Sequence, residues 1–486
     1  TPAAAAAAAQ HPSMWNEDLR PCTLPEHSWP AMKFSSLWIG MCICLPTYSL
    51  AASMIALGMN WWEAVLTIFS GSAVVMTAIL LVSHAGTKFG IPYPVFARLW
   101  FGTRGAHIPA LARALIAAGW FGINSWFGGQ ALSAILDAIL PAWRGFDAGN
   151  HDGAVGIAFA VFWVINVAIA MRGPQAIGRL AQIAAPTLTV AAIALLVWAL
   201  RSEGGLGPIL AMPGKLHGSM FWLNFFGSMI GVIAFWATMA LNIPDYTRYA
   251  TSQRAQILGQ IWAMPLTMAL FSFVGIVVTS ATVALFGTPL WNPVDLIVKF
   301  PPAVVVIGGI VVILSSVTIN VGANVVAPAR AFENLWPSRI TFSIGAILTG
   351  ILALATQPWK ELSSPHTYIF DWLGAYGALL GAFDGIAIAD YWFVRKCRLN
   401  LAALYSPNSV YGYADGLNGW AVVALNIGWI IALVGHFVAP LSFLWTGGWL
   451  FSLLGGLITY TLFMRGTSSA ISQPEYDAIT ARSTSV

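Results

Sequence analysis

Apolar residues form long continuous runs that recur along almost the whole chain. A helix needs roughly 20 apolar residues to cross the hydrocarbon core of a bilayer, and most of the runs reach about that length. They are continuous rather than alternating, which favours helices over the strands of a membrane barrel. The pattern predicts an all-α protein with twelve transmembrane helices, at residues 34–58, 62–84, 107–138, 154–171, 177–200, 217–242, 257–286, 303–328, 340–356, 368–393, 418–438 and 442–464.

The composition agrees with a polytopic membrane protein. Of the 486 residues, 58% are hydrophobic and 8% are charged, whereas soluble domains carry about 25% charged residues. This balance excludes a soluble enzyme or a disordered scaffold, and the net charge of +4 is too small for a nucleic-acid-binding patch. The four cysteines form no ligand pattern with histidines, so the sequence predicts neither a disulfide framework nor a metal site.

Lys and Arg residues are distributed unequally between the predicted loops. With the N-terminus inside, 16 of them fall on the cytoplasmic side and 5 on the outer side, while Arg113 lies within the third span. Cytoplasmic loops attract positive residues, so both termini are expected in the cytoplasm. The loop 243–256, with Asp245 and Arg248, is expected to form a cytoplasmic gate or an ion network at helix ends, or else a simple positive anchor.

The spans divide into two halves of five and a final pair. The predicted organisation is a cytoplasmic N-terminal tail, a first and a second five-helix repeat, two accessory helices and a cytoplasmic C-terminal tail, at residues 1–33, 34–200, 217–393, 418–464 and 465–486 respectively.

The first and sixth spans, which lead the two halves, both carry residues that interrupt helices. Pro46 removes a backbone donor near the middle of the first span, and the sixth contains Gly227 and Gly231 ahead of Phe235 and Trp236. Broken helices at matching places of two halves indicate an inverted-repeat transporter with its binding site at the breaks. The alternative interpretation is that these residues only kink packed membrane helices.

Amide side chains are retained in the middle of the third and eighth spans, where uncompensated polar groups are costly. Trp120 and Asn124 are four residues apart on one helix face, and Asn320 and Asn324 repeat this spacing. Carboxamides suit a neutral solute with ring N–H and C=O groups, and Trp120 and Trp236 are candidates to hold its ring between them. These central segments carry no charge, so an uncharged ligand is expected. Alternatively, each amide only joins neighbouring helices.

Asp384 is the exception among the later spans, because it is an acidic residue inside the tenth. An ionisable group at that depth is a candidate for proton coupling. The alternative is that its carboxylate reaches toward the cytoplasmic end of the helix, near Asp390.

Seven short segments, spread through nearly the whole chain, together form a specific pattern: Asn16-Glu17-Asp18-Leu19-Arg20-Pro21, Leu45-Pro46-Thr47-Tyr48, His84-Ala85-Gly86-Thr87-Lys88, Gly119-Trp120-Phe121-Gly122, Asn242-Ile243-Pro244-Asp245-Tyr246-Thr247-Arg248, Asn320-Val321-Gly322-Ala323-Asn324 and Ala389-Asp390-Tyr391-Trp392-Phe393-Val394-Arg395. In them the chain resembles the nucleobase:cation symporter-1 family, most of all the bacterial allantoin and hydantoin permeases. The resemblance implies a ten-helix inverted-repeat core with two added helices, alternating access around a mid-membrane site, and a place in the bacterial inner membrane.

The resemblance also assigns roles to site residues. Trp120 and Trp236 match two tryptophans that hold the ligand ring, Asn324 matches an asparagine that binds its polar edge, and Phe235 falls where backbone groups near the sixth-helix break meet ligand. Two positions depart from the family. Asn124 stands where the longer glutamine is usual, and Cys44, a weaker donor, stands where an amide is common, which leaves the exact heterocycle open. The expected substrate-binding residues are Cys44, Trp120, Asn124, Phe235, Trp236, Asn320 and Asn324.

The cation site of sodium-coupled relatives is degenerate in this chain. In those relatives, two adjacent hydroxyl residues on the eighth helix complete a sodium shell with carbonyls of the first helix. The matching positions here are Thr318 and Ile319, and Gly40, Ile43 and Ser315 are expected to offer only carbonyl oxygens. Ile319 supplies no side-chain oxygen, so proton coupling is favoured and sodium coupling is the alternative.

Secondary active uptake of a neutral nitrogen heterocycle or cyclic ureide is the function that the sequence favours. The alternatives are a sodium-coupled uracil or cytosine symporter and a sensor that binds the ligand without transporting it. An enzyme is not expected, because His84, His217, His366 and His436 are too scattered to form a catalytic cluster. A channel would need charge rings or repeated carbonyls along a pore. Apart from the substrate, a co-transported ion and lipid, no cofactor or protein partner is implied.

Overall fold

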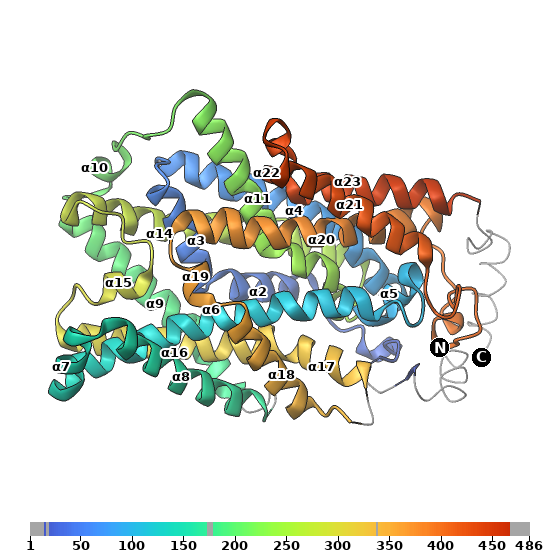
Figure 1. Cartoon of the computed structure of the whole chain (residues 1–486), viewed down its shortest axis with the longest axis horizontal. Helices are drawn as coiled ribbons and strands as arrows, with labels where there is room; N and C mark the ends of the chain where they lie inside the picture. Colours follow the sequence, from blue (N-terminus) through green and yellow to red (C-terminus); the bar gives the residue numbers. More distant parts are fainter. Residues whose placement is uncertain (1–13, 16–18, 173–177, 337–338, 467–486) are drawn as a thin grey trace.

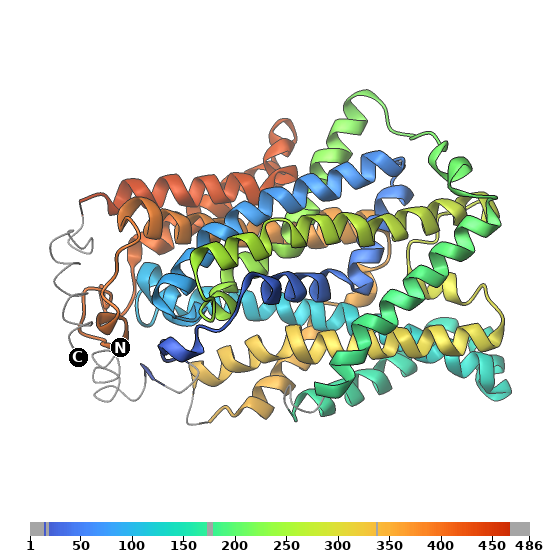
Figure 2. The same ribbon diagram turned by 180° about the vertical axis from the view of Figure 1, so that it is seen from behind.

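The computed structural model describes residues 14–15, 19–172, 178–336 and 339–466. Its long helices run side by side along the longest axis of the molecule, as Figures 1 and 2 show from opposite sides. The described residues contain two isolated β-bridges, Trp29–Ala250 and Ala414–Leu417, but no strand. Helix α5 (Tyr93–Phe101) lies at one end of the bundle and α7 (Pro141–Gly149) at the other, and we call these the α5 end and the α7 end.

Each of the twelve predicted segments falls on helix. The first five correspond to α2 (Ala31–Cys42) with α3 (Leu45–Ala56), α4 (Trp61–Phe89), α6 (His107–Ile139), α8 (His151–Ala170) and α9 (Gly178–Ser202). The next five are α11 (Gly218–Asn242), α13 (Gln253–Gln260) with α14 (Ala263–Phe286), α16 (Pro302–Ile319) with η4 (Asn320–Val325) and α17 (Val326–Leu335), α18 (Phe342–Ala355), and η5 (Thr367–Leu373) with α20 (Gly374–Ile388) and η6 (Ala389–Val394). The last two are α21 (Gly419–Phe437) and α23 (Gly448–Met464).

Short helices lie in the connections between these spans. Besides α5 and α7, they are α10 (Leu206–Leu210), α12 (Pro244–Thr247), α15 (Pro293–Ile297), α19 (Pro358–Glu361), η7 (Ala402–Tyr405), η8 (Ala439–Leu441) and α22 (Ser442–Thr446), while η2 (Leu24–Glu26) precedes the first span.

Length and composition identify most of these segments as membrane spans. Within the described part of the chain, 8 helices are long and apolar enough to cross a membrane, and two bent pairs raise the number to 10. The remaining two predicted spans are α18, which has only 14 residues, and α6, which has 33. Helix α6 carries amides and Arg113, which lower its hydropathy, and its central part is buried among other helices rather than in lipid.

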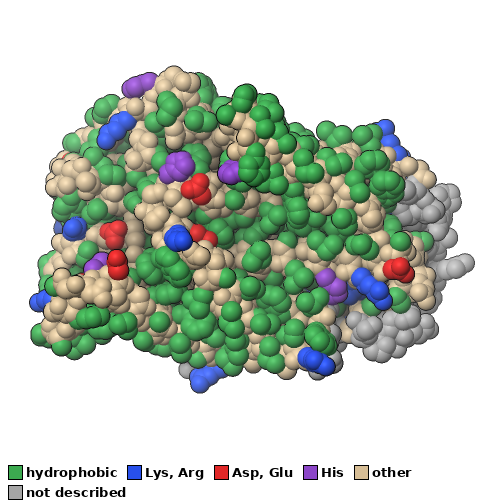
Figure 3. Space-filling model, in the orientation of Figure 1, with side chains coloured by type: hydrophobic (Ala, Val, Ile, Leu, Met, Phe, Trp, Pro, Cys, Tyr) green, Lys and Arg blue, Asp and Glu red, His purple; other side chains and the backbone are tan. Residues whose placement is uncertain are grey.

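The surface of the molecule is largely apolar. In Figure 3, hydrophobic side chains cover much of the visible face and charged side chains are few. Exposed large side chains include Val190, Leu270, Ile307 and Leu462, each from a different long helix. A soluble monomer rarely exposes such extensive apolar area, whereas a lipid-facing surface requires it.

Equivalent helices of the two halves make equivalent contacts. Helix α3 of the first span packs against α14, and α11 of the sixth packs against α4, which is the same pairing with the halves exchanged. Likewise α6 packs on α8 as α17 packs on α18, and α9 contacts α16 as α20 contacts α6. This exchange symmetry is that of a five-plus-five repeat. The accessory helices α21 and α23 cover α20. The residue boundaries of the five predicted units remain a prediction.

The first span is broken, as its proline predicts. Helix α2 ends at Cys42, Ile43 and Cys44 leave helical geometry, and α3 restarts at Leu45 with an axis bent by 59°. Pro46 falls in the first turn of α3, where a missing N–H costs nothing because those donors have no helical partner. The break leaves carbonyls near the end of α2 without their usual helical partners, although Ile39 O still accepts from Ile43 N and Cys42 O from Cys44 N.

The sixth span is continuous, so the prediction of a break there was wrong. Helix α11 runs without interruption past both glycines. A Cβ at Gly227 would collide with the ring of Phe370, and one at Gly231 would lie 3.0 Å from Ile369 Cγ2. These glycines therefore allow η5 to approach the backbone of α11 closely. Glycine serves close packing and helix breaking alike, and the sequence does not distinguish the two uses.

Three π-helical segments, which the sequence did not reveal, occur in the second half. They are η4, η5 and η6, and the first contains both predicted asparagines of the eighth span. A π-turn adds a residue to the local repeat and is frequently found at functional sites. The break in the first half therefore faces a π-helical segment rather than a second gap.

Candidate functional site

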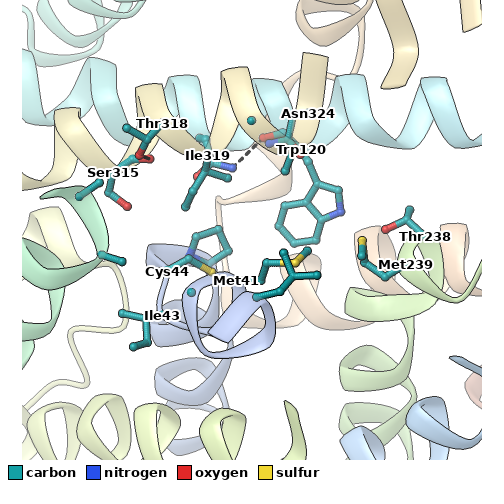
Figure 4. Close-up of a pocket in the computed structure, with 18 of the residues that line it drawn as sticks. Met41, Ile43, Cys44, Trp120, Thr238, Met239, Ser315, Thr318, Ile319 and Asn324 are labelled. Carbon is teal, nitrogen blue, oxygen red and sulfur yellow. Dashed lines mark hydrogen bonds between the residues drawn. The ribbon is translucent and has the colours of Figure 1, made fainter. Parts of the chain in front are cut away.

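A cavity of about 530 Å³ lies at the break between α2 and α3. Its walls come from α2, α6, α9, α11, α16 and η4, so both halves contribute. Figure 4 shows Cys44 at the break, Trp120 and Asn324 on the facing helices, and Thr238 and Met239 beside them. Six of the seven predicted substrate residues line the cavity: Cys44, Trp120, Asn124, Phe235, Trp236 and Asn324.

The two predicted indoles are held by other aromatic rings. Trp120 meets Phe235 edge-on, with 5.0 Å between the ring centroids, and Phe235 meets Trp236 at 5.1 Å. Trp236 is also fixed by Trp38, at 5.2 Å. Edge-to-face contacts of this kind stabilise by about 0.5–1.5 kcal/mol beyond area burial, so they hold the indoles in defined orientations.

The paired asparagines of the eighth span have different positions relative to the cavity. Asn324 lines the cavity, and its Nδ2 donates to Asn320 Oδ1 at 2.9 Å. Asn320 lies behind it, fully buried, and its own Nδ2 donates to Phe121 O at 3.0 Å and Ser125 Oγ at 3.1 Å. Asn320 therefore links η4 to α6 and orients Asn324. It holds a residue of the cavity wall and is not part of the wall.

Two uncharged side chains of the cavity wall, Asn124 and Trp236, each have a polar atom without a hydrogen-bond partner in the described part of the chain. Asn124 is held by its Nδ2, which donates to Trp120 O at 2.9 Å, while its Oδ1 is unpartnered. The Nε1 of Trp236 is also buried and unpartnered. Buried polar groups are nearly always hydrogen-bonded, so an acceptor and a donor on the wall of one cavity are suited to a ligand that has both N–H and C=O groups.

A search of family models matches residues 21–454 to the family described as permease for cytosine/purines, uracil, thiamine, allantoin. The chain belongs to this family. It is the nucleobase:cation symporter-1 family that the sequence motifs indicate, and the protein is a transporter and not an enzyme.

Individual relatives agree with this assignment. The permease is 41% identical to the purine-uracil permease NCS1 of Arabidopsis thaliana, over 89% of this chain and 73% of the relative. It is 38% identical to the allantoin permease of Bacillus subtilis, over 93% of both chains. Among solved structures, the inward-facing conformation of Mhp1 matches 96% of this chain and 97% of Mhp1, with a TM-score of 0.79 and 22% identity. Mhp1 in a closed conformation with bromovinylhydantoin bound matches with a TM-score of 0.75. At this identity the structural likeness shows the fold.

The residues of the degenerate cation site also meet at this cavity. Gly40 and Ile43 from the end of α2, and Ser315 and Thr318 from α16, all line it, and Figure 4 shows the α16 residues across from Ile43. Thr318 Oγ1 donates to Leu314 O at 2.8 Å and Ser315 O at 3.0 Å. Its proton is thus occupied within its own helix. The residues named here contain oxygen atoms that could bind a cation, and cation binding at this place stays a prediction.

A cationic side chain, Arg113, also lines the cavity, which corrects the expectation of an uncharged site. Arg113 is 7% exposed, and its Nε and Nη1 have no partner in the described structure. With the Asn242 amide turned to satisfy its hydrogen bonds, its Oδ1 lies 3.3 Å from Arg113 Nη2. The sequence showed this arginine within the third span but not that its side chain reaches the cavity, seven residues before Trp120.

Arg113 marks the junction with a second cavity of about 550 Å³, on the side of the α5 end. This second cavity is lined by charged groups, including Asp245, Arg248, Arg330 and Glu333. Asp245 Oδ1 accepts a hydrogen bond from the Tyr93 N–H at 2.8 Å. Burial raises the pKa of Asp245, an effect that this N–H and Arg113 oppose.

The loop 243–256 forms part of a network that joins helix ends. Arg248 donates to Arg20 O and, from Nε, to Cys22 Sγ at 3.1 Å. Together with the Asp245 contact, these bonds connect the loop to the segment before α2 and to α5. These contacts are hydrogen bonds to backbone groups and a thiol, so the expected gate or ion network stays a prediction.

Trp120, in the wall of the cavity, is covered by aromatic side chains of η5 and α20, which follow α19 along the chain. Trp120 contacts Tyr368, Trp372 and Tyr376, with centroids 6.5, 6.4 and 6.4 Å away. We call these four residues the aromatic cap. A Cβ at Gly119 would collide with Trp372, so α6 accepts the cap only because a glycine precedes Trp120. Tyr368 also donates to Pro46 O at 3.3 Å, which joins the cap to α3.

Asp384 is fully buried. Its Oδ2 accepts a hydrogen bond from Trp449 Nε1 at 3.0 Å, and its Oδ1 has no partner in the described structure. It therefore faces the accessory helix α23, and it lines neither cavity. A role in proton coupling stays a prediction, and this position gives no direct route from Asp384 to the substrate.

Proposed function

We propose that this permease imports a neutral nitrogen heterocycle or cyclic ureide of the allantoin, hydantoin or nucleobase type by proton-coupled symport. The observation that carries the proposal is a single cavity at a helix break that presents two fixed indoles and two amides. The purine-uracil and allantoin permeases that resemble this chain support the same substrate class.

The unpartnered wall atoms indicate how such a ligand is held. A ring N–H donates to Asn124 Oδ1, which has no other partner in the described structure. Leaving such a buried group unpaired costs about 1–3 kcal/mol, so a ring that lacks the matching group is bound roughly 5- to 150-fold more weakly. The flat faces of the ring are covered by Trp120 and Trp236. An acidic imide gains further from the nearby Arg113.

The proposed transport cycle is alternating access in the bacterial inner membrane, with the α5 end in the cytoplasm. The excess of Lys and Arg in the loops of the α5 end supports this orientation. The substrate cavity adjoins the second cavity on the α5 side and is covered by the aromatic cap on the other, as expected when the site communicates with the cytoplasm. Opening the cap would expose the same residues to the outside.

Uptake of labelled allantoin, hydantoin and uracil by cells that express the protein tests the substrate class. We expect accumulation of at least one of them, and we expect Trp120→Ala to reduce it at least tenfold because it removes one face of the ring site. Trp222→Ala is the matched control, since Trp222 is exposed on α11 away from the cavity. Failure to accumulate any of the three compounds would refute the proposed substrate class.

The coupling ion is tested in the same cells. Proton coupling predicts that a protonophore abolishes accumulation and that replacing sodium with choline has little effect. The alternative, a sodium-coupled uracil or cytosine symporter, predicts the reverse and a strong loss in Thr318→Ala, because that hydroxyl oxygen would be a sodium ligand. Counterflow in proteoliposomes separates a transporter from a protein that only binds its ligand.

A further inference from the structure

A buried carboxyl group lies beside the aromatic cap, and neither the substrate site nor the cation site uses it. Glu361 ends α19, the short helix between the ninth and tenth spans, and its side chain is only 9% exposed. Its Oε2 has no hydrogen-bond partner in the described structure, and the same holds for Trp372 Nε1 in the cap. Such a cluster of unsatisfied polar atoms is unusual in a protein interior.

Among the residues that the structure describes, the elements around Glu361 bring no countercharge. Helix α19 packs against α6 and η5. From η5 and α20 the ionisable groups that face Glu361 are Tyr368 and Tyr376. From α6 the contact is Gly122, where an added Cβ would lie 3.3 Å from Pro358 Cγ. The nearest charged residue along that helix is Arg113, about 13 Å away along the axis. Lys360, on α19 itself, is exposed.

Helix α8 brings the uncharged ring of Phe159 against Trp359 of α19. An ionised carboxylate without a partner is strongly disfavoured in such surroundings, whereas a neutral carboxyl group is tolerated.

We propose that Glu361 is a proton-binding switch of the aromatic cap: it takes a proton from water on the α7 side when the cap closes and loses it when the cap opens. The step is a simple proton transfer, in which the carboxylate accepts H⁺ from hydronium and releases water. Closing removes water from the carboxyl group, so the closed state selects its neutral form. This inference rests on the proposed alternating-access function, because it requires that η5 and α19 move away from α6 when the α7 side opens.

The sign of the pH effect follows from burial. In the closed arrangement, burial raises the pKa of Glu361 from its ordinary value of 4.5 to about 8. An open, hydrated carboxyl group keeps the ordinary value. Between these two values only the closed state binds the proton, so acid favours closure, and this preference is lost as the pH rises through 8. The closed-to-open ratio is expected to rise about tenfold between pH 9 and pH 7.

Cys44 provides a natural reporter for the cap, because it lies in the substrate cavity beneath it and is 6% exposed. The other three cysteines are replaced: Cys22→Ser, Cys42→Ala and Cys397→Ser. An impermeant maleimide applied to intact cells then reaches Cys44 only while the cap is open. Thiol ionisation also depends on pH, so each labelling rate is divided by that of Glu361→Gln at the same pH.

The glutamine variant mimics the neutral state at every pH, so the ratio reports only the response of Glu361. We expect the ratio to fall about tenfold from pH 9 to pH 7, because protonation of Glu361 closes the cap. Glu361→Asp, which still ionises, should keep the pH dependence, and this shows that a loss in Glu361→Gln is not a folding defect. Glu203→Gln is the matched control, because Glu203 follows α9 at the α7 end, outside the cap. A ratio that does not change with pH would overturn the proposal. Loss of the pH dependence in Glu203→Gln would also overturn it, because that residue lies outside the cap.

The labelling experiment needs no transported substrate. If labelling follows the expected pH dependence but no heterocycle is accumulated, the proposed substrate fails and the proton switch stands. If uptake is normal and the ratio is flat, the switch fails and the proposed function stands.

Discussion

The two sides of the substrate cavity are closed by different physical means. Toward the α7 end, Trp120 is covered by the rings of Tyr368, Trp372 and Tyr376. Toward the α5 end, the cavity adjoins a second one whose wall includes Arg113 and Asp245. Ring packing acts only at contact, so a small displacement of η5 is enough to lose it. Charges act over longer distances, and burying them requires fixed partners. We therefore call the aromatic cap the lid, and we call the part of the protein at the α5 end, where charged groups are buried, the frame.

The largest effect is expected where the frame is braced by a buried ion pair. Asp390 and Arg395, both fully buried, are joined at 2.7 Å, and Tyr460 from α23 donates to Asp390 at 2.6 Å. Asp390→Asn should lower the free energy of unfolding by about 3–5 kcal/mol, because it leaves a buried guanidinium without its countercharge. Thermal unfolding in detergent measures this.

The exposed pair Arg330–Glu333, at 3.1 Å, is the control for that measurement. Glu333→Gln should change the free energy of unfolding by less than about 1 kcal/mol, because exposed ion pairs contribute little. Equal losses in Asp390→Asn and Glu333→Gln would contradict the view that burial decides the strength of the frame.

The next effect concerns the lid. Gly119→Ala places a methyl group against the ring of Trp372, so we expect a loss of about 1–3 kcal/mol and faster labelling of Cys44 from outside. Gly156→Ala, on α8, meets no atom within 4 Å and should be neutral or slightly stabilising. Unchanged labelling in Gly119→Ala would mean that the aromatic cap does not control access.

The smallest effect is expected at the junction of the two cavities. Arg113→Met removes a buried cation whose Nε and Nη1 are unpartnered, so the free energy of unfolding should rise by about 1 kcal/mol while uptake falls. Arg254→Met, at an exposed position of the α5 end, should alter neither. A destabilised Arg113→Met with normal uptake would show that this arginine serves the fold instead of transport.

Much of the fold was predictable because it depends on local properties of the chain. Apolar runs of span length are costly outside lipid or a packed interior, so their positions gave all twelve helical segments. The break at Pro46 follows from a missing N–H. The site was partly predictable as well, because Trp120, Asn124 and Asn324 are polar or bulky groups retained at mid-span. Their roles in binding remain predictions.

Other features depend on contacts between distant segments. The glycines of α11 were interpreted as a break, and only the approach of Phe370 and Ile369 reveals their packing role. Asn320 and Asn324 have the same spacing and the same chemistry, but one lies behind the other.

By itself, the sequence determined which segments enter the membrane, where the first of them breaks, and which side chains are too polar to be there without a purpose. Only the tertiary structure decided that Arg113 reaches the cavity and that Glu361 is buried without a countercharge among the described residues. The reason is that hydropathy is a property of the chain near each residue, whereas desolvation and hydrogen-bond satisfaction depend on neighbours that are remote in sequence.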